Sequence, residues 1–300
     1  SPLQSGTQAR VFTSVDGAAT RDNLVSSGAQ EFSVDRQGQS GSVRADLAAQ
    51  IAQIGGDGME CLIDYTDHNV MYGELYYGDI RRSTNHGGSW YNISNSIPGS
   101  GAWVTPYVID PNDHLTLYVG YAELHKSTNR GDSWTQISSF GGSTLRSIAV
   151  APSNSNYIYT ATTGTLYKTS NGGGSWSNIT SGLPGYTITY ISVKDDDPNT
   201  LWVSLGQFNT HGVYESTDGG TSWTNISTGL PELPINCVIQ NKQNTSEVEL
   251  YCGTDVGVFV KQGTADWTAF YSNMPNVVVT ELDIYYAASP VDSRIRAATY

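Results

Sequence analysis

The stretch Ser83–Trp90 reads STNHGGSW, and it recurs as STNRGDSW over Ser127–Trp134, as TSNGGGSW over Thr169–Trp176 and as STDGGTSW over Ser216–Trp223. The closing tryptophans of these segments, followed by Trp267, are separated by 44, 42, 47 and 44 residues. A repeat of about 40–50 residues with strand-like content is typical of the blades of a β-propeller. This octapeptide repeat therefore decides the fold class.

Each period of the repeat contains apolar runs separated by turns. Turns rich in Asp, Asn, Ser and Pro at 110–113, 152–155 and 196–199 separate the first run from the second, and these residue types favour tight reversals of the chain. Short strands of this kind at regular spacing indicate an all-β architecture. We therefore predict a β-propeller of about seven four-stranded blades, in which the octapeptide forms a hairpin of each regular blade.

The octapeptide has a local structural explanation. The Asn or Asp at its third position can accept hydrogen bonds from backbone N–H groups of the turn. The glycine at its fifth position permits a positive φ angle, and the tryptophan returns a large apolar ring to the blade, where burial stabilises the fold by about 1.5–3 kcal/mol. The residues assigned this structural role are Ser83, Asn85, Gly87, Trp90, Ser127, Asn129, Gly131, Trp134, Asn171, Gly173, Trp176, Ser216, Asp218, Gly220 and Trp223.

The repeat also predicts the domain organisation. We expect one propeller over residues 1–300, with regular blades in 55–300 and a divergent first blade and closure strand in 1–54. Joining the first and last blades in this way protects the sheet edges of the ring.

The composition argues against several classes of partner. Fifteen Lys and Arg against 28 Asp and Glu give a formal charge of −13, which repels nucleic acid backbones and anionic lipid headgroups. No run approaches the roughly 18–20 apolar residues of a membrane-spanning helix. We therefore expect no nucleic acid partner and no membrane insertion. Because the chain starts at Ser1 and not at Met, we expect a processed product or part of a longer protein.

The cysteines and histidines do not show the spacing of a metal site. Cys237 and Cys252 could face each other across a hairpin, which allows a disulfide in an oxidising compartment, and two buried thiols are the other interpretation. We expect no metal ion and no cofactor.

The repeat resembles a known motif. The pattern S-x-D/N-x-G-x-S/T-W is similar to the Asp-box of the BNR-repeat propellers, a group that includes sialidases, the sortilin luminal domain and xyloglucan-hydrolysing endoglucanases. Gly55–Gly58, which reads GGDG, and Arg296–Tyr300, which reads RAATY, resemble segments of endoglucanase-like propellers in large secreted bacterial proteins. The resemblance implies a secreted or bacterial cell-surface location, with other domains of a parent protein as partners.

In related propellers ligands usually bind on the face opposite the Asp-boxes, and the loops that map to that face carry aromatic residues. Aromatic side chains beside an acidic or neutral rim suit the apolar faces of sugar rings, so a polysaccharide or glycan is the expected ligand. Packing within the strands is the alternative explanation for each ring. The candidate ligand-binding residues are Tyr76, Tyr77, Trp103, Tyr121, Tyr186 and Phe208.

Glycoside hydrolysis needs two convergent carboxylates, and the same loops supply the candidates Asp57, Asp79, Glu123, Glu232 and Asp255. The endoglucanases that the chain resembles build their cleft between two propeller domains, whereas this chain holds at most one. We therefore favour a non-catalytic recognition or scaffolding module that binds carbohydrate. A glycoside hydrolase and a purely structural assembly subunit are the alternatives.

Overall fold

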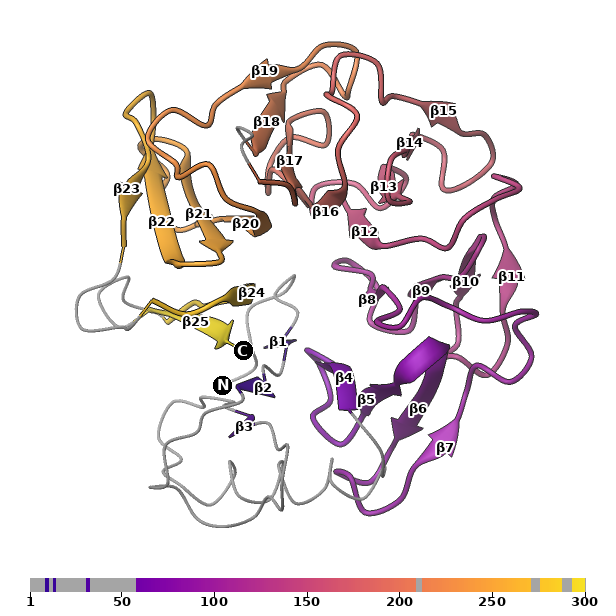
Figure 1. Cartoon of the computed structure of the whole chain (residues 1–300). Coiled ribbons are helices and arrows are strands. Elements are labelled where there is room, and N and C mark those ends of the chain that lie inside the picture. Colours follow the sequence, from indigo (N-terminus) through magenta and orange to yellow (C-terminus); the bar gives the residue numbers. More distant parts are fainter. Residues whose placement is uncertain are drawn as a thin grey trace.

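The computed structural model describes residues 58–208, 212–270, 276–287 and 293–299, together with the backbone of three short strands, β1 (Ala9–Arg10), β2 (Thr13–Ser14) and β3 (Glu31–Phe32). Antiparallel sheets follow one another around a central axis, as Figure 1 shows. The predicted all-β propeller with four-stranded blades is confirmed.

The first two described blades begin at β4 and β8, and in the first of them β1 is added outside β4 as a fifth strand. The first blade contains β4 (Gly58–Ile63), β5 (Met71–Leu75), the one-turn 3-10 helix η2 (Tyr76–Gly78), β6 (Asp79–Ser83) and β7 (Tyr91–Asn92). The second blade contains β8 (Tyr107–Ile109), β9 (Leu117–Gly120), β10 (Leu124–Ser127) and β11 (Thr135–Gln136).

The next three blades repeat this order. The third contains β12 (Ser147–Val150), β13 (Ile158–Ala161), β14 (Leu166–Thr169) and β15 (Ser177–Asn178). The fourth contains β16 (Ile188–Val193), β17 (Leu201–Leu205), β18 (Val213–Ser216) and β19 (Thr224–Asn225). The fifth contains β20 (Ile235–Gln240), β21 (Glu249–Thr254), β22 (Gly257–Gln262) and β23 (Thr268–Ala269).

The chain ends in a sheet of two described strands, β24 (Val279–Tyr285) and β25 (Arg294–Thr299). The N-terminal strands lie next to both ends of the ring: β1 pairs antiparallel with β4, β2 pairs with β3, and β2 also contacts β25. The sequence predicts a divergent first blade and a closure strand in residues 1–54, and apart from these short strands that segment lies outside the described residues.

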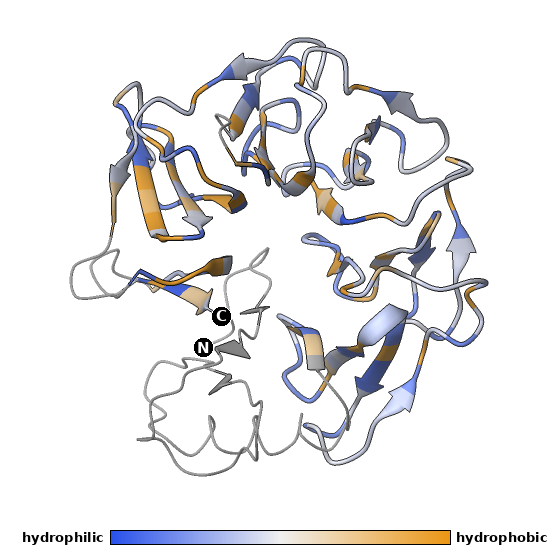
Figure 2. Ribbon diagram, in the orientation of Figure 1, coloured by the Kyte–Doolittle hydropathy of each residue, from blue (hydrophilic) through white to orange (hydrophobic). Residues whose placement is uncertain are grey.

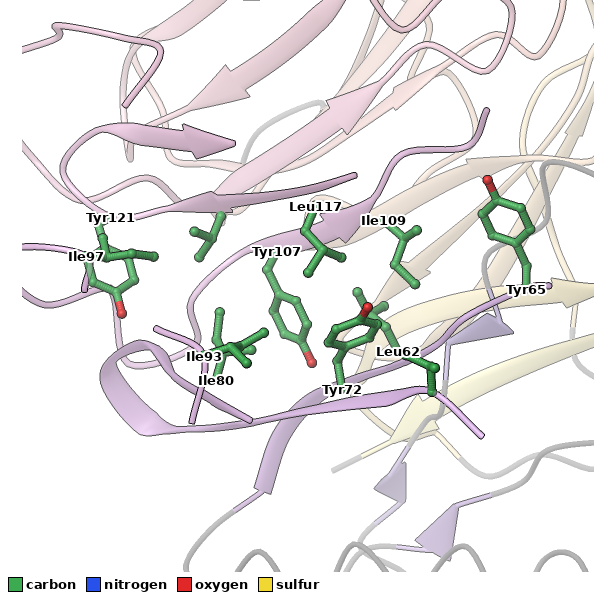
Figure 3. Packing of buried hydrophobic residues seen from close by; sticks show 12 residues of the cluster. Leu62, Tyr65, Tyr72, Ile80, Ile93, Ile97, Tyr107, Ile109, Leu117 and Tyr121 are labelled. Carbon is green, nitrogen blue, oxygen red and sulfur yellow. The ribbon is translucent and has the colours of Figure 1, made fainter. Parts of the chain in front are cut away.

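The hydrophobic core lies between neighbouring blades. One cluster combines Leu62, Tyr72 and Ile80 of the first blade with Tyr107 and Leu117 of the second, and Figure 3 shows these side chains facing one another. Hydrophobic residues concentrate on the first two strands of each blade, while the third strands carry several charged or polar residues and the outermost strands and the loops are mostly hydrophilic (Figure 2). Burying apolar surface on both faces of each sheet holds successive blades together.

The four octapeptide hairpins share one hydrogen-bond pattern. In the first, Ser83 Oγ accepts a hydrogen bond from Gly87 N–H (2.8 Å), and Asn85 Oδ1 accepts one from Ser89 N–H (2.9 Å). The corresponding bonds recur in the hairpins of the next three blades. Backbone donors that a tight turn would leave unpaired are satisfied in this way.

The sequence predicts that each tryptophan packs within its own blade. In the structure the tryptophans also donate a hydrogen bond to the preceding blade. The Trp134 indole N–H donates to the Ile93 carbonyl (2.6 Å), and the Trp176 indole N–H donates to that of Ile137 (2.7 Å). Trp223 and Trp267 bond to Ile179 and Ile226 in the same way. We call this contact the blade clamp.

The strand register shows whether Cys237 and Cys252 face each other as a disulfide would require. Cys237 lies opposite Gly253 and Cys252 opposite Val238 on the neighbouring strand, and both are buried and form no disulfide, as is also true of Cys61. Burial raises the pKa of the Cys252 thiol well above its ordinary value, which keeps it neutral and unreactive.

Candidate functional site

The innermost strands enclose a central cavity of about 550 Å³. Its walls come from β4, β8, β12, β16, β20 and β24, and its polar and aromatic lining includes Glu60, Tyr107, Arg146, Tyr190, Asn236 and Glu281. Sequence reasoning missed these residues. The signal that would have found them is the repeat itself, because the first strand of every period contributes one segment of the wall.

Side chains fix the spacing of the inner strands. Tyr107 OH donates to the Glu60 carbonyl (2.7 Å), so β8 is bonded to β4. Likewise, Asn236 Nδ2 donates to the Val279 carbonyl (3.1 Å), which bonds β20 to β24. A cavity walled by backbone that is tied from blade to blade is preformed, as is usual for ligand sites.

Three exposed aromatic rings contact one another beside this cavity. Tyr76 and Tyr77 belong to η2, and Trp103 belongs to the loop between β7 and β8. The Tyr76 and Trp103 rings stack with centroids 5.4 Å apart and an interplanar angle of 11°, while Tyr77 lies edge-on to both rings. Their exposed fractions are 43%, 51% and 48%. We call these three residues the aromatic cluster.

The aromatic cluster lies at the rim of the cavity. Val104, the neighbour of Trp103 in the chain, lines the cavity and is itself exposed. Tyr77 N–H donates to the Trp103 carbonyl and Gly101 N–H donates to the Tyr77 carbonyl (3.1 Å), so the two segments are bonded to each other. The aromatic cluster therefore adjoins the cavity through Val104, and none of its three rings is part of the cavity lining itself.

One predicted ligand residue is instead a support for this cluster. Tyr121 is buried, and its hydroxyl donates to the Gly78 carbonyl (2.7 Å) at the end of η2. Gly78 has a φ of 85°, and a Cβ there would lie 2.6 Å from the Tyr121 ring. Tyr121 therefore packs under η2 and is not available to contact a ligand.

A buried carboxyl group lies beneath the cluster. Glu74, the second-last residue of β5, has an exposed fraction of 1%, and its Oε1 accepts a hydrogen bond from Thr105 N–H (2.8 Å). Burial, opposed by hydrogen bonds from Thr105 and assisted by the charge of Glu60, raises the pKa of Glu74 to about 8. The acid is therefore mostly protonated at neutral pH. Sequence analysis missed it, because the burial of every residue of β5 is a property of the fold and is not visible in the sequence.

The other predicted aromatic residues do not join the cluster. Tyr186 is half-buried and packs against the core between the third and fourth blades. Phe208 follows β17 and is exposed, and within the described residues it has no aromatic ring contact.

Two of the predicted catalytic carboxylates hold loops in place. Asp79 pairs with Arg81 (2.8 Å). Glu123 accepts hydrogen bonds from the Phe140 and Gly141 N–H groups (both 2.8 Å) and from Ser138 Oγ. Burial raises the pKa of Glu123, but these hydrogen bonds outweigh it and the net direction is down. A carboxylate with a lowered pKa is a poor general acid.

The remaining catalytic candidates are dispersed. Asp255 accepts a hydrogen bond from Asn236 Nδ2 (3.1 Å), and Glu232 is exposed on the loop before β20. Asp57 lies outside the described residues. The described candidates come from different blades or loops, and no hydrogen bond joins any two of them.

The described part of the chain contains no group of three or more His, Cys, Asp or Glu side chains arranged to hold a metal ion. In that same part, no helix has the length and hydropathy required to cross a bilayer.

Comparison with solved structures returned other propellers. An ancestral GH74 enzyme is 20% identical over 80% of this chain and 34% of its own, with a TM-score of 0.63. The GH74 xyloglucanase from Xanthomonas campestris is 15% identical over 71% of this chain and 38% of its own, with a TM-score of 0.54. YCF48 bound to D1 peptide is 13% identical over 77% of this chain and 72% of its own, with a TM-score of 0.54.

These identities establish the fold alone, and the chain spans only about a third of the length of the GH74 enzymes. A search of curated proteins found no match. A family model described as "Sortilin, neurotensin receptor 3" matches residues 122–272.

Proposed function

The chain belongs to the Sortilin-Vps10 family, and we propose that it is a recognition or scaffolding propeller that binds carbohydrate at the aromatic cluster. The observation that carries the proposal is the mutual contact of Tyr76, Tyr77 and Trp103, next to the cavity-lining Val104, with about half of each residue exposed. Large aromatic rings gain stability when they are buried. Leaving three of them in solvent at one place is therefore characteristic of a binding surface.

The charge of the molecule supports a neutral sugar as ligand. A formal charge of −13 disfavours acidic glycans and phosphorylated ligands. Stacked rings offer flat apolar faces to the C–H faces of pyranose rings, while the polar groups of the nearby cavity wall can bond to hydroxyl groups. We propose further that the chain is secreted or displayed on a bacterial surface as part of a larger protein. The sequence resemblance supports this location.

Binding to a panel of neutral polysaccharides, measured by affinity electrophoresis and calorimetry, tests the proposal. We expect Trp103→Ala and Tyr76→Ala each to weaken binding by about tenfold or more, which corresponds to about 1.4 kcal/mol. Tyr91→Ala is the matched control, because Tyr91 is 61% exposed but lies on the outermost strand β7. If no glycan binds, or if Trp103→Ala binds as well as wild type, the proposal is wrong.

A glycoside hydrolase is the second candidate, because two carboxylates, Glu60 and Glu281, line the same cavity. Hydrolysis by two acids is the usual chemistry of such enzymes. Release of reducing ends from a bound polysaccharide, abolished by Glu60→Gln or Glu281→Gln, would establish it. Glycan binding without such release favours the recognition module. Absence of binding together with self-association would favour a structural assembly subunit.

A further inference from the structure

We propose that Glu74 is the positioning residue of the aromatic cluster: its buried carboxyl group joins the segment that carries the two tyrosines to the loop that carries Trp103, and ligand binding therefore depends on its protonation state. The inference rests on the proposed function for its effect on binding. Its structural part, the coupling between Glu74 and Trp103, can be tested without any ligand.

The connection between the two segments passes through few atoms. Glu74 is separated from Tyr76 by one residue, and its Oε1 is bonded to the backbone of Thr105, two residues after Trp103. Thr105 is itself buried, and its hydroxyl donates to the Ala102 carbonyl (2.9 Å), which closes the turn that presents Trp103. A shift of the carboxyl group is therefore transmitted to the ring through the Ala102–Thr105 turn.

The surroundings of Glu74 leave its charge poorly compensated. Its Oε2 is buried and makes no direct hydrogen bond to any described residue. Glu60 and Cys61 face it from β4, the uncharged Ile80 lies opposite it on β6, and Tyr121 approaches from the second blade. Burial raises the pKa of both Cys61 and Tyr121, so these two stay neutral. The charge of Glu60 raises the pKa of Glu74, and a backbone hydrogen bond from Glu60 offsets part of that effect.

Linkage determines the direction of the effect. We call the arrangement with Glu74 bonded to Thr105 closed, and one in which the Ala102–Thr105 turn is displaced and water reaches the carboxyl group open. In the closed arrangement the pKa of Glu74 is about 8, and in the open arrangement it falls toward the ordinary value of 4.5. The closed arrangement therefore retains a proton that the open one loses between these two values. Raising the pH through this range shifts the population toward the open arrangement, and the shift is complete near pH 8. Affinity falls with the closed fraction.

The ligand-free test follows the Trp103 indole N–H signal by NMR in ¹⁵N-tryptophan protein, assigned by its absence in Trp103→Phe. In wild type we expect this signal to shift or broaden as pH rises from 5.5 to about 8.5, and in Glu74→Gln to stay constant, because the amide stays neutral across this range. Glu247→Gln is the control, since Glu247 is exposed and outside the site. A Trp103 signal in wild type that is independent of pH overturns the proposal.

The binding test repeats glycan titrations over the same pH range. We expect wild-type and Glu247→Gln affinity to fall by about threefold or more with rising pH, and Glu74→Gln affinity to stay within about 1.5-fold. If Trp103→Ala leaves binding intact, the proposed function fails, while the NMR titration still decides the coupling. If wild type and Glu74→Gln show the same pH profile, the positioning role fails although the glycan site stands.

Discussion

The blade clamp makes a sharp prediction about two adjacent glycines in the third hairpin. Gly172 and Gly173 both have positive φ angles, 68° and 99°. A Cβ on Gly173 would lie 2.8 Å from Ile137 Cβ in the preceding blade, whereas one on Gly172 would have only the Asn156 side-chain oxygen nearby, at 3.3 Å. We therefore compare Gly173→Ala with Gly172→Ala.

The magnitudes follow from the two environments. An L-residue in the left-handed region costs about 1–2 kcal/mol, and both variants incur this cost. Gly173→Ala adds overpacking of about 1–3 kcal/mol. It also pushes on Ile137, whose carbonyl accepts the Trp176 bond, at a cost of about 0.5–1.5 kcal/mol. We expect losses of about 3–6 kcal/mol for Gly173→Ala and about 1–2 kcal/mol for Gly172→Ala.

Urea denaturation followed by circular dichroism and tryptophan fluorescence measures both losses. The other blades support the smaller value for Gly172, since His86 and Arg130 occupy the same hairpin position with φ angles of 57° and 59°. If the two variants are equally destabilised, the close approach of the hairpin to the preceding blade is not what requires glycine, and the clamp argument fails.

Two further substitutions test interactions between blades. Trp176→Phe removes the indole N–H donor but keeps most of the ring, and we expect a loss of about 1–2 kcal/mol in urea unfolding; a loss below about 0.5 kcal/mol would show that the bond is dispensable. Asp64→Asn removes a buried carboxylate that pairs with His114 and Arg130 of the second blade. Burial raises the pKa of Asp64, but hydrogen bonds from His114 and Thr66 outweigh it and lower the pKa below 3.8, so this carboxylate stabilises the fold above that pH and the benefit disappears as pH falls through the lowered value. We expect Asp64→Asn to lower the free energy of unfolding by about 2–4 kcal/mol at pH 7. The difference in unfolding free energy between wild type and variant should become smaller below about pH 3.8. A difference that does not change with pH contradicts the stabilising role of this carboxylate.

The sequence predicts the structure within each repeat, and it does not predict the contacts that form between blades. The octapeptide indicates four-stranded blades because its hydrogen bonds are local, as with Asn85 and Ser89. The partner of Trp176 is 39 residues earlier in the chain, so no local pattern indicates the blade clamp.

The candidate site was predicted in part. Tyr76, Tyr77 and Trp103 were identified as loop aromatics, but their mutual contact depends on how η2 and the loop from the next blade pack together. Tyr121 belongs to the same class by sequence and yet points inward, because assignment to a loop does not fix the direction of a side chain. Glu74 was missed because its importance comes from burial, which alternation within one strand does not reveal.

The aromatic cluster lies where the connection between the second and third strands of the first blade differs from that of the second blade. In the second blade the connection from β9 to β10 is 121–123, and it places Tyr121 in the core. In the first blade the equivalent connection is the helical turn η2, in which Tyr76 and Tyr77 are exposed. Repeated hairpins and clamps hold the ring rigidly, so a connection that breaks the pattern can change shape without cost to the blades. In this propeller, binding chemistry is therefore expected in the irregular connections and stability in the regular ones.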